Sequence, residues 1–178
     1  MKHLILSLLI AFTFNAGAQV ENLKLKNALV IALLEQEDDH FSIEINLTEL
    51  LSNAGIKAIP SLNILKRGNY ATVLATDSIQ ELTRTMGVDT YMLVSVRGYD
   101  KKFKPSSCKD DLQQALSVGN LFPIYRDEIV SVSFEFTFYR NGQCVGSDIV
   151  KCGNVSDRES VLKKFRKQIT KKITNDWL

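Results

Sequence analysis

The stretch that decides the fold is residues 130–152, VSVSFEFTFYRNGQCVGSDIVKC. Apolar and polar side chains alternate along its first half: Val130, Val132, Phe134, Phe136 and Phe138 form one set, and Ser131, Ser133, Glu135, Thr137 and Tyr139 the other. This period of two is typical of an antiparallel strand with one buried face and one wet or lightly covered face. Asn141 and Gly142 tolerate the positive φ angles of a type I′ turn, so Gln143 to Cys152 is predicted to return as the second strand of a hairpin.

Upstream of the hairpin, strand-like and helix-like segments alternate. Residues 28–34, ALVIALL, form a continuous apolar run that suits a strand buried on both faces. A helix is predicted next, because apolar residues recur at helical offsets and Gly55 can end the helix. Those apolar residues are Ile43, Leu47, Leu50, Leu51 and Ala54. Residues 57–65 read as an edge or broken strand, since Pro60 cannot donate to a sheet.

Two capping boxes mark further helices. Asp77 with Gln80 is predicted to open a helix that ends at Gly87, and the apolar residues 90–96 then form a central strand. Ser156 with Glu159 is predicted to open the C-terminal helix. Its inward positions are Val161, Leu162, Phe165, Ile169, Ile173 and Trp177, and its basic residues are Lys163, Lys164, Arg166, Lys167, Lys171 and Lys172. The basic side is interpreted as a solvated outer face.

The first eighteen residues have the form of a secretory signal peptide. Lys2 precedes a short apolar core, and Ala16 and Ala18 supply an A-x-A cleavage site, so the mature chain should begin at Gln19. The apolar core is too short to span a bilayer, which needs about 20 such residues. We therefore expect a periplasmic or secreted, soluble protein without a membrane span.

The assembled order is β-α-β-α-β, a long connection, a β-hairpin and a closing helix. It predicts an α/β to α+β fold, with a single mixed sheet of about five strands and helices packed against it. Of the 178 residues, those from 19 to 178 are expected to form one domain, because their number suits one continuous core.

This order, with the exported start, resembles the small α/β domain of Gram-negative envelope proteins. Examples are the amino-terminal domain of the Tol-Pal translocation protein and the curli-secretion lipoprotein. The residues that carry the resemblance are 28–34, the phrases LLSNAG at 50–55 and MGVDTY at 86–91, and the late hairpin. The resemblance implies binding and assembly in the envelope and carries over no catalytic residue. The chain has glutamine at position 19, where lipoprotein members have an acylated cysteine.

Composition and histidine count exclude several function classes. Without the signal peptide the chain has 21 basic and 20 acidic residues, a balance that predicts no binding of nucleic acid. His40 is then the sole histidine, which excludes a zinc site with several histidines. No cofactor motif is present, so no cofactor is expected.

Three cysteines in an exported chain permit one disulfide. Cys144 and Cys152 should lie on one strand, where eight residues separate them by roughly 26 Å, too far for a disulfide. A disulfide within the chain would therefore join Cys108 to Cys144 or to Cys152. The alternative is three unpaired cysteines.

The acidic stretch 35–40 is the basis of an alternative function. Glu37, Asp38, Asp39 and His40 follow a central strand, at the sheet edge where open α/β sheets often bind ligands. Convergent carboxylates could hold a divalent cation, which would favour a cation-dependent hydrolase. The simpler interpretation is a solvated loop whose acids stabilise the following helix start.

The leading hypothesis is a non-enzymatic binding or assembly accessory that contacts another envelope protein or envelope component. Residues 98–128 connect two strands, whereas most connections have about 4 to 6 residues. Lys101, Lys102, Phe103 and Lys104 are the predicted partner-binding residues, because a basic patch beside an aromatic combines steering with an apolar anchor. The connection could instead simply cover one side of the sheet, with Asp110 or Asp111 capping a short helix through Val118. The oligomeric state is left open.

Overall fold

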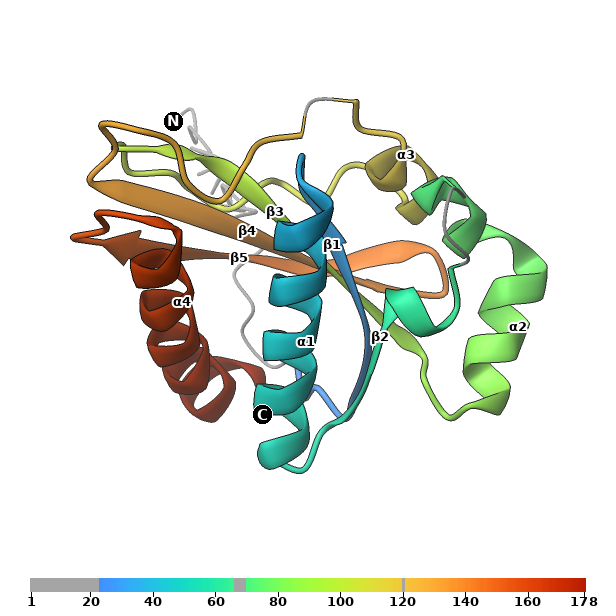
Figure 1. The fold of residues 1–178 in the computed structure, drawn as a ribbon. Coiled ribbons are helices and arrows are strands. Elements are labelled where there is room, and N and C mark those ends of the chain that lie inside the picture. The colour runs from blue at the N-terminus through green and yellow to red at the C-terminus, as the bar shows by residue number, and fades with distance from the viewer. Residues whose placement is uncertain (1–22, 66–69, 120) are drawn as a thin grey trace, which may run out of the picture.

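The computed structural model describes residues 23–65, 70–119 and 121–178, so the predicted signal peptide at 1–18 lies outside the described residues. The strands are β1 (Asn27–Leu33), β2 (Lys57–Pro60), β3 (Thr90–Tyr99), β4 (Ser131–Arg140) and β5 (Gln143–Gly153). They form one open mixed sheet in the order β2-β1-β3-β4-β5 (Figure 1). β1 pairs in parallel with β2 and β3, and β3, β4 and β5 pair antiparallel. The predicted α/β fold with a mixed sheet is confirmed.

Helices cover both faces of the sheet. Helices α1 (Glu37–Asn53) and α4 (Arg158–Lys172) lie side by side on one face, and α4 continues into a π-helical turn, Ile173–Trp177 (Figure 1). The other face is covered by α2 (Asp77–Thr85), α3 (Leu112–Leu116) and a 3₁₀ turn, Ala71–Ala75. A second 3₁₀ turn, Ser61–Asn63, follows β2. Within the described ranges, no helix is long and apolar enough to cross a membrane.

β1 is buried on both faces, as its continuous apolar run predicts. Ala28, Val30 and Ala32 face the core under α1 and α4, whereas Leu29 and Ile31 belong to the core on the other side. A strand between two helical layers meets no water on either side, and this removes the polar alternation seen in a strand with one wet face.

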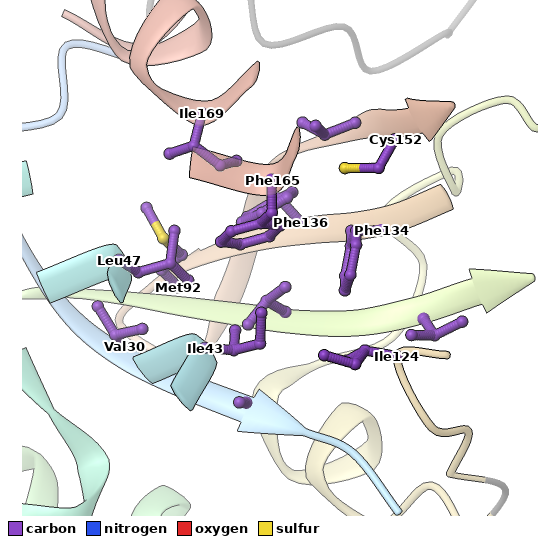
Figure 2. Packing of buried hydrophobic residues seen from close by; sticks show 14 of the residues in the cluster. Val30, Ile43, Leu47, Met92, Ile124, Phe134, Phe136, Cys152, Phe165 and Ile169 are labelled. Carbon is purple, nitrogen blue, oxygen red and sulfur yellow. The ribbon is translucent and has the colours of Figure 1, made fainter. Parts of the chain in front are cut away.

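The core under α1 and α4 is built on the apolar face of β4. Phe134 and Phe136 point toward Phe165 of α4, and Ile43 and Leu47 of α1 complete the layer (Figure 2). Phe134 and Phe165 meet edge to face with their ring centroids 4.8 Å apart, and Phe138 packs on Trp177 at 5.4 Å. The inward positions predicted for the C-terminal helix are confirmed, with Leu162 only partly buried.

The hairpin has the predicted turn, but its second face is not wet. Asn141 and Gly142 have φ angles of +50° and +75°, as a type I′ turn requires. Ser133, Glu135 and Tyr139, on the polar face of β4, are all buried. The covering segment is the 98–128 connection, which hydrogen bonds to β4 and β5. Val130, expected in the apolar face, precedes β4 and is 64% exposed.

Neither capping box forms as predicted. The N-cap residue of α2 is Thr76, whose side chain makes no capping hydrogen bond, so Asp77 is already the first helical residue, and the Gln80 side-chain amide donates to the Ala75 carbonyl. Helix α4 is capped by Asp157 with Ser160, one residue after the predicted pair. The Ser156 carbonyl instead accepts a hydrogen bond from the Tyr125 hydroxyl. Residues 57–65 form a strand only as far as Pro60, where the chain turns into the 3₁₀ turn.

Candidate functional site

The 98–128 connection is clamped where it leaves and rejoins the sheet. The Asp100 carboxylate accepts hydrogen bonds from the backbone amides of Val130 and Ser131 at 3.0 and 2.8 Å. Burial acts to raise the pKa of Asp100, but these amides, the Ser131 hydroxyl and Arg126 outweigh it, so the pKa lies below its usual value. Asp100 therefore fixes the two ends of the connection beside each other.

The middle of the connection is pinned to the hairpin. Cys108 is joined by a disulfide to Cys144 of β5, which is one of the two pairings left open by the sequence, and Cys152 is buried as a free thiol. Ser106 contacts both hairpin strands: its amide donates to Glu135 at 2.7 Å, and its carbonyl accepts from the Ser147 hydroxyl at 2.7 Å. The connection is therefore held covalently and by hydrogen bonds across β4 and β5.

The short helix α3 closes the covering layer. Asp111, one of the two predicted caps, forms a capping box with Gln114, and the helix ends at Leu116 rather than Val118. Leu112 and Leu116 are buried against the sheet, and the Leu112 amide donates to the Gly142 carbonyl in the hairpin turn.

The last part of the connection packs into the body of the protein. Ile124 is fully buried in the core, and the Tyr99 hydroxyl donates to the Pro123 carbonyl at 2.6 Å. Arg126 lies over the Tyr99 ring, with the guanidinium carbon 4.3 Å from the ring centroid. Phe122, in contrast, is 43% exposed.

The four predicted partner-binding residues do not share one environment. Lys101, Lys102 and Lys104 are exposed, whereas Phe103 is half-buried. The Phe103 ring lies on Gly98, so close that a Cβ built on Gly98 would be 2.6 Å from the ring Cζ atom. Phe103 therefore fixes the connection to β3, and the three exposed lysines flank Phe103 in the sequence.

A pocket of about 320 Å³ lies between the connection and the sheet. It lies over β3 and β4, beside the carboxyl end of β1, where Leu33 pairs with Ser95 of β3. Its floor is the polar face of the sheet, and α3 and the following residues form its wall. The lining residues are Leu33, Leu93, Ser95, Val96, Arg97, Ser106, Asp110, Ala115, Val118, Leu121, Phe122, Glu135, Thr137 and Tyr139.

Charged and hydroxyl groups line the floor of this pocket. The Glu135 side chain is 9% exposed and lies 3.6 Å from the half-exposed Arg97 guanidinium. Tyr139 is 3% exposed. Burial raises the pKa of Tyr139 to about 12, and the nearby Asp110, Glu135 and Asp111 carboxylates add to the shift. Sequence reasoning missed this site, although polar residues on one strand face opposite a long connection are a signal that could have found it.

The acidic stretch does not form the predicted solvated loop. Helix α1 already begins at Glu37, and Asp39 is buried. The Asp39 carboxylate accepts from the Arg158 guanidinium at 2.5 Å and from the Ile124 amide at 3.3 Å. His40 instead contacts the buried Glu44 at 2.8 Å. Asp39 and His40 thus have separate partners, and no three metal-ligating side chains converge within residues 23–65, 70–119 and 121–178.

The chain matches no protein-family model and no curated protein. Among solved structures it is similar to lipoprotein GNA1162 from Neisseria meningitidis, with a TM-score of 0.45 and 16% identity over 84% of this chain and 98% of that chain. It is also similar to two structures of the PelC dodecamer from Paraburkholderia phytofirmans, each with a TM-score of 0.46 and 15% identity over 89% of this chain. Those matches cover 91% and 89% of the PelC chains. At such identities and TM-scores, the similarities assign the chain to no family.

Proposed function

We propose that this chain is an exported, non-enzymatic accessory of the cell envelope that binds another envelope protein through its 98–128 connection. The observation that carries the proposal is the contrast within the connection. It is fixed at its ends by Asp100 and in its middle by the disulfide, yet it leaves Lys101, Lys102 and Lys104 exposed. A fixed backbone loses little conformational entropy on binding, which favours a recognition surface.

The three lysines define the chemistry of the partner. Exposed ammonium groups attract an acidic surface and raise the rate of encounter. Phe103 holds the lysines at one place on the sheet through its contact with Gly98. The partner surface should therefore be acidic, and Phe103 should act by positioning the lysines.

The test is charge reversal of the lysines in the full chain. We expect the triple variant Lys101→Glu, Lys102→Glu, Lys104→Glu to lose a partner that crosslinks to the unchanged chain in the envelope fraction. The matched control is Lys163→Glu, Lys167→Glu, Lys171→Glu, which reverses three exposed lysines on α4. Equal crosslinking by both triple variants, with both folded, would contradict the proposal.

Export is tested separately by intact mass. Material recovered outside the cytoplasm should begin at Gln19, because the A-x-A site ends at Ala18. A retained first segment would contradict export by this signal.

The cation-dependent hydrolase is not proposed. Its candidate residues Asp39 and His40 are engaged with Arg158 and Glu44 of this chain rather than with each other.

A further inference from the structure

The pocket beneath the connection is a second candidate site, and it does not depend on the lysine surface. The sheet order β2-β1-β3 places β1 between two parallel neighbours, which are reached by crossovers on opposite faces through α1 and α2. The boundary between β1 and β3 is thus a topological switch point. Open α/β sheets bind ligands outside the carboxyl ends of strands at such a point. Leu33, the last residue of β1, and its neighbour Ser95 within β3 bring the pocket to that boundary, and the pocket extends from there over β3 and β4.

The Tyr139 hydroxyl is an unused hydrogen-bonding group in this pocket. Within the described ranges the hydroxyl has no hydrogen-bond partner, although Tyr139 is only 3% exposed. Among those residues, Thr48 Oγ1 is the one fully enclosed side-chain polar atom without a hydrogen-bond partner. The Tyr139 hydroxyl also lacks a partner, so it is not fully enclosed, and it opens onto the pocket that Tyr139 lines. A hydroxyl that opens onto a pocket floor can donate to or accept from a polar ligand atom bound there.

The charge of the lining favours a cation. Glu135 and Asp110 are acidic, and Arg97 is the one basic residue that lines the pocket. Arg97 approaches Glu135 only to 3.6 Å and is 47% exposed, so it neutralises the carboxylate incompletely. The Ser106 amide satisfies Oε1 of Glu135 and leaves Oε2 able to accept a further donor.

The opposite wall of the pocket is apolar and partly open. Val118, Leu121 and Phe122 are 54%, 37% and 43% exposed, and all three line the pocket. Leu33 and Leu93 add apolar surface from the sheet. The volume of about 320 Å³ lies at the small end of the range for ligand pockets, about 300–1,000 Å³.

We propose that this pocket binds a small organic cation, a primary ammonium group carried on an apolar body. The ammonium group donates to Glu135 Oε2 and to Asp110. The apolar body packs between Leu33 and the wall formed by Val118, Leu121 and Phe122. The Tyr139 hydroxyl pairs with a polar atom of the ligand at the pocket floor.

Three probes of similar shape test the proposal by NMR titration of the intact, oxidised chain. Phenethylamine is the cation, 2-phenylethanol is its neutral counterpart, and 3-phenylpropionate is an anion. We expect phenethylamine to bind with a Kd of about 1 mM, as suits a ligand of this size, and to shift the amides of Arg97, Glu135 and Tyr139. The alcohol should bind about tenfold more weakly because it lacks the charge-assisted hydrogen bond, and the anion should bind weakest.

Two variants separate the roles of the lining residues. Glu135→Gln keeps an oxygen for the Ser106 amide but removes the charge, so it should abolish the preference for the amine over the alcohol. Tyr139→Phe should weaken both probes and keep their ratio. The control Glu49→Gln alters an exposed acid on α1, paired with Arg166, and should change neither affinity. Binding of the anion as tight as that of the amine would overturn the proposal. So would an unchanged amine preference in folded Glu135→Gln, or the absence of shifts in the pocket amides.

Discussion

At the scale of single residues, Glu44 is a buried acid that accepts four hydrogen bonds. Its side chain is fully buried, and its Oε1 atom accepts from the Ala32 amide at 2.9 Å, the Ser61 hydroxyl at 2.6 Å and His40 Nε2 at 2.8 Å. Its Oε2 atom accepts from the Leu62 amide at 3.2 Å. One carboxylate thus joins β1, α1 and the 3₁₀ turn after β2.

Replacing Glu44 should destabilise the protein strongly. Glu44→Ala leaves several buried donors unpaired, so we expect the free energy of unfolding to fall by about 3 to 5 kcal/mol. Glu44→Gln keeps one oxygen for three of the four donors and should cost about 1 to 2 kcal/mol. Denaturant titration measures both losses. Glu49→Ala, an exposed position on the same helix, is the control and should leave the midpoint nearly unchanged.

Sequence reasoning could not find this role of Glu44. In a helix whose apolar residues define the buried face, an acid such as Glu44 is predicted to be solvated. The partners of Glu44 that show otherwise, Ser61 and Leu62, follow 17 and 18 residues later in the sequence. Asp39 was assigned to a solvated loop for the same reason, since its partner Arg158 lies 119 residues away. Contacts between distant polar residues leave no periodic signal in the sequence.

At the scale of elements, the contact between Gly98 and Phe103 should control the start of the connection. Gly98 has a φ of +150° and follows an irregularity in the pairing of β3 with β4. Gly98→Ala places a methyl group against the Phe103 ring, so we expect a loss of about 1 to 3 kcal/mol in unfolding free energy. Phe103→Ala removes the obstacle, and the double variant should therefore lose less than the sum of the single losses. Additive losses in denaturant titrations would contradict this contact.

The Cys108–Cys144 disulfide is the second link that holds the connection on the sheet. It closes a loop between positions 36 residues apart, for which chain entropy predicts a stabilisation of about 3 to 4 kcal/mol. The variant Cys108→Ser, Cys144→Ser should lower the free energy of unfolding by that amount. Cys152→Ala is the comparison for removing a cysteine that forms no bridge. Equal stability of the oxidised chain and the double serine variant would show that the bridge does not stabilise the fold.

Strands and long helices were predictable, whereas their exact starts were not. The period of two in β4 and the NG turn fix the hairpin locally, and the apolar run of β1 requires a layer on each side. Which residues cap α2 and α4 depends on the contacts of the chain that precedes each helix. The Thr76 hydroxyl donates to the Val73 carbonyl in the preceding 3₁₀ turn, and the Ser156 carbonyl accepts from the Tyr125 hydroxyl. The pocket also escaped prediction, because it exists only where a distant connection is folded over β4.

At the scale of the whole molecule, the covering connection belongs to the fold. Ile124 lies in the core under α1 and α4, and Leu112 and Leu116 lie in the core on the other face. Shortening residues 101–125 to a brief linker would expose both cores. We therefore expect a steep fall in melting temperature, measured by circular dichroism, and point variants are the proper test of binding. A deletion variant that melts like the full chain would show that the connection is dispensable for folding.

The pH dependence of the whole molecule should be set on the alkaline side by buried acids whose pKa is raised, and Cys152 and Tyr139 have the largest shifts among them, above Tyr91 and Tyr99. Burial raises the pKa of the Cys152 thiol from 9.0 to about 12, with Lys164 opposing the shift, and burial raises the pKa of Tyr139 from 10.0 to about 12. In both cases the folded state holds its proton more tightly than the unfolded state. Their contribution to stability is therefore complete below pH 9 and is lost as pH rises from about 9 to 12.

Denaturant titrations between pH 7 and 11 check this prediction. The free energy of unfolding should be level up to about pH 9 and should then fall. Tyr139→Phe should reduce the slope of the fall, because phenylalanine has no proton to release. This variant is the decisive one, since a thiolate formed at Cys152 on unfolding can also attack the Cys108–Cys144 disulfide. An identical slope in Tyr139→Phe and the unchanged chain would mean that the Tyr139 hydroxyl titrates alike in the folded and unfolded states.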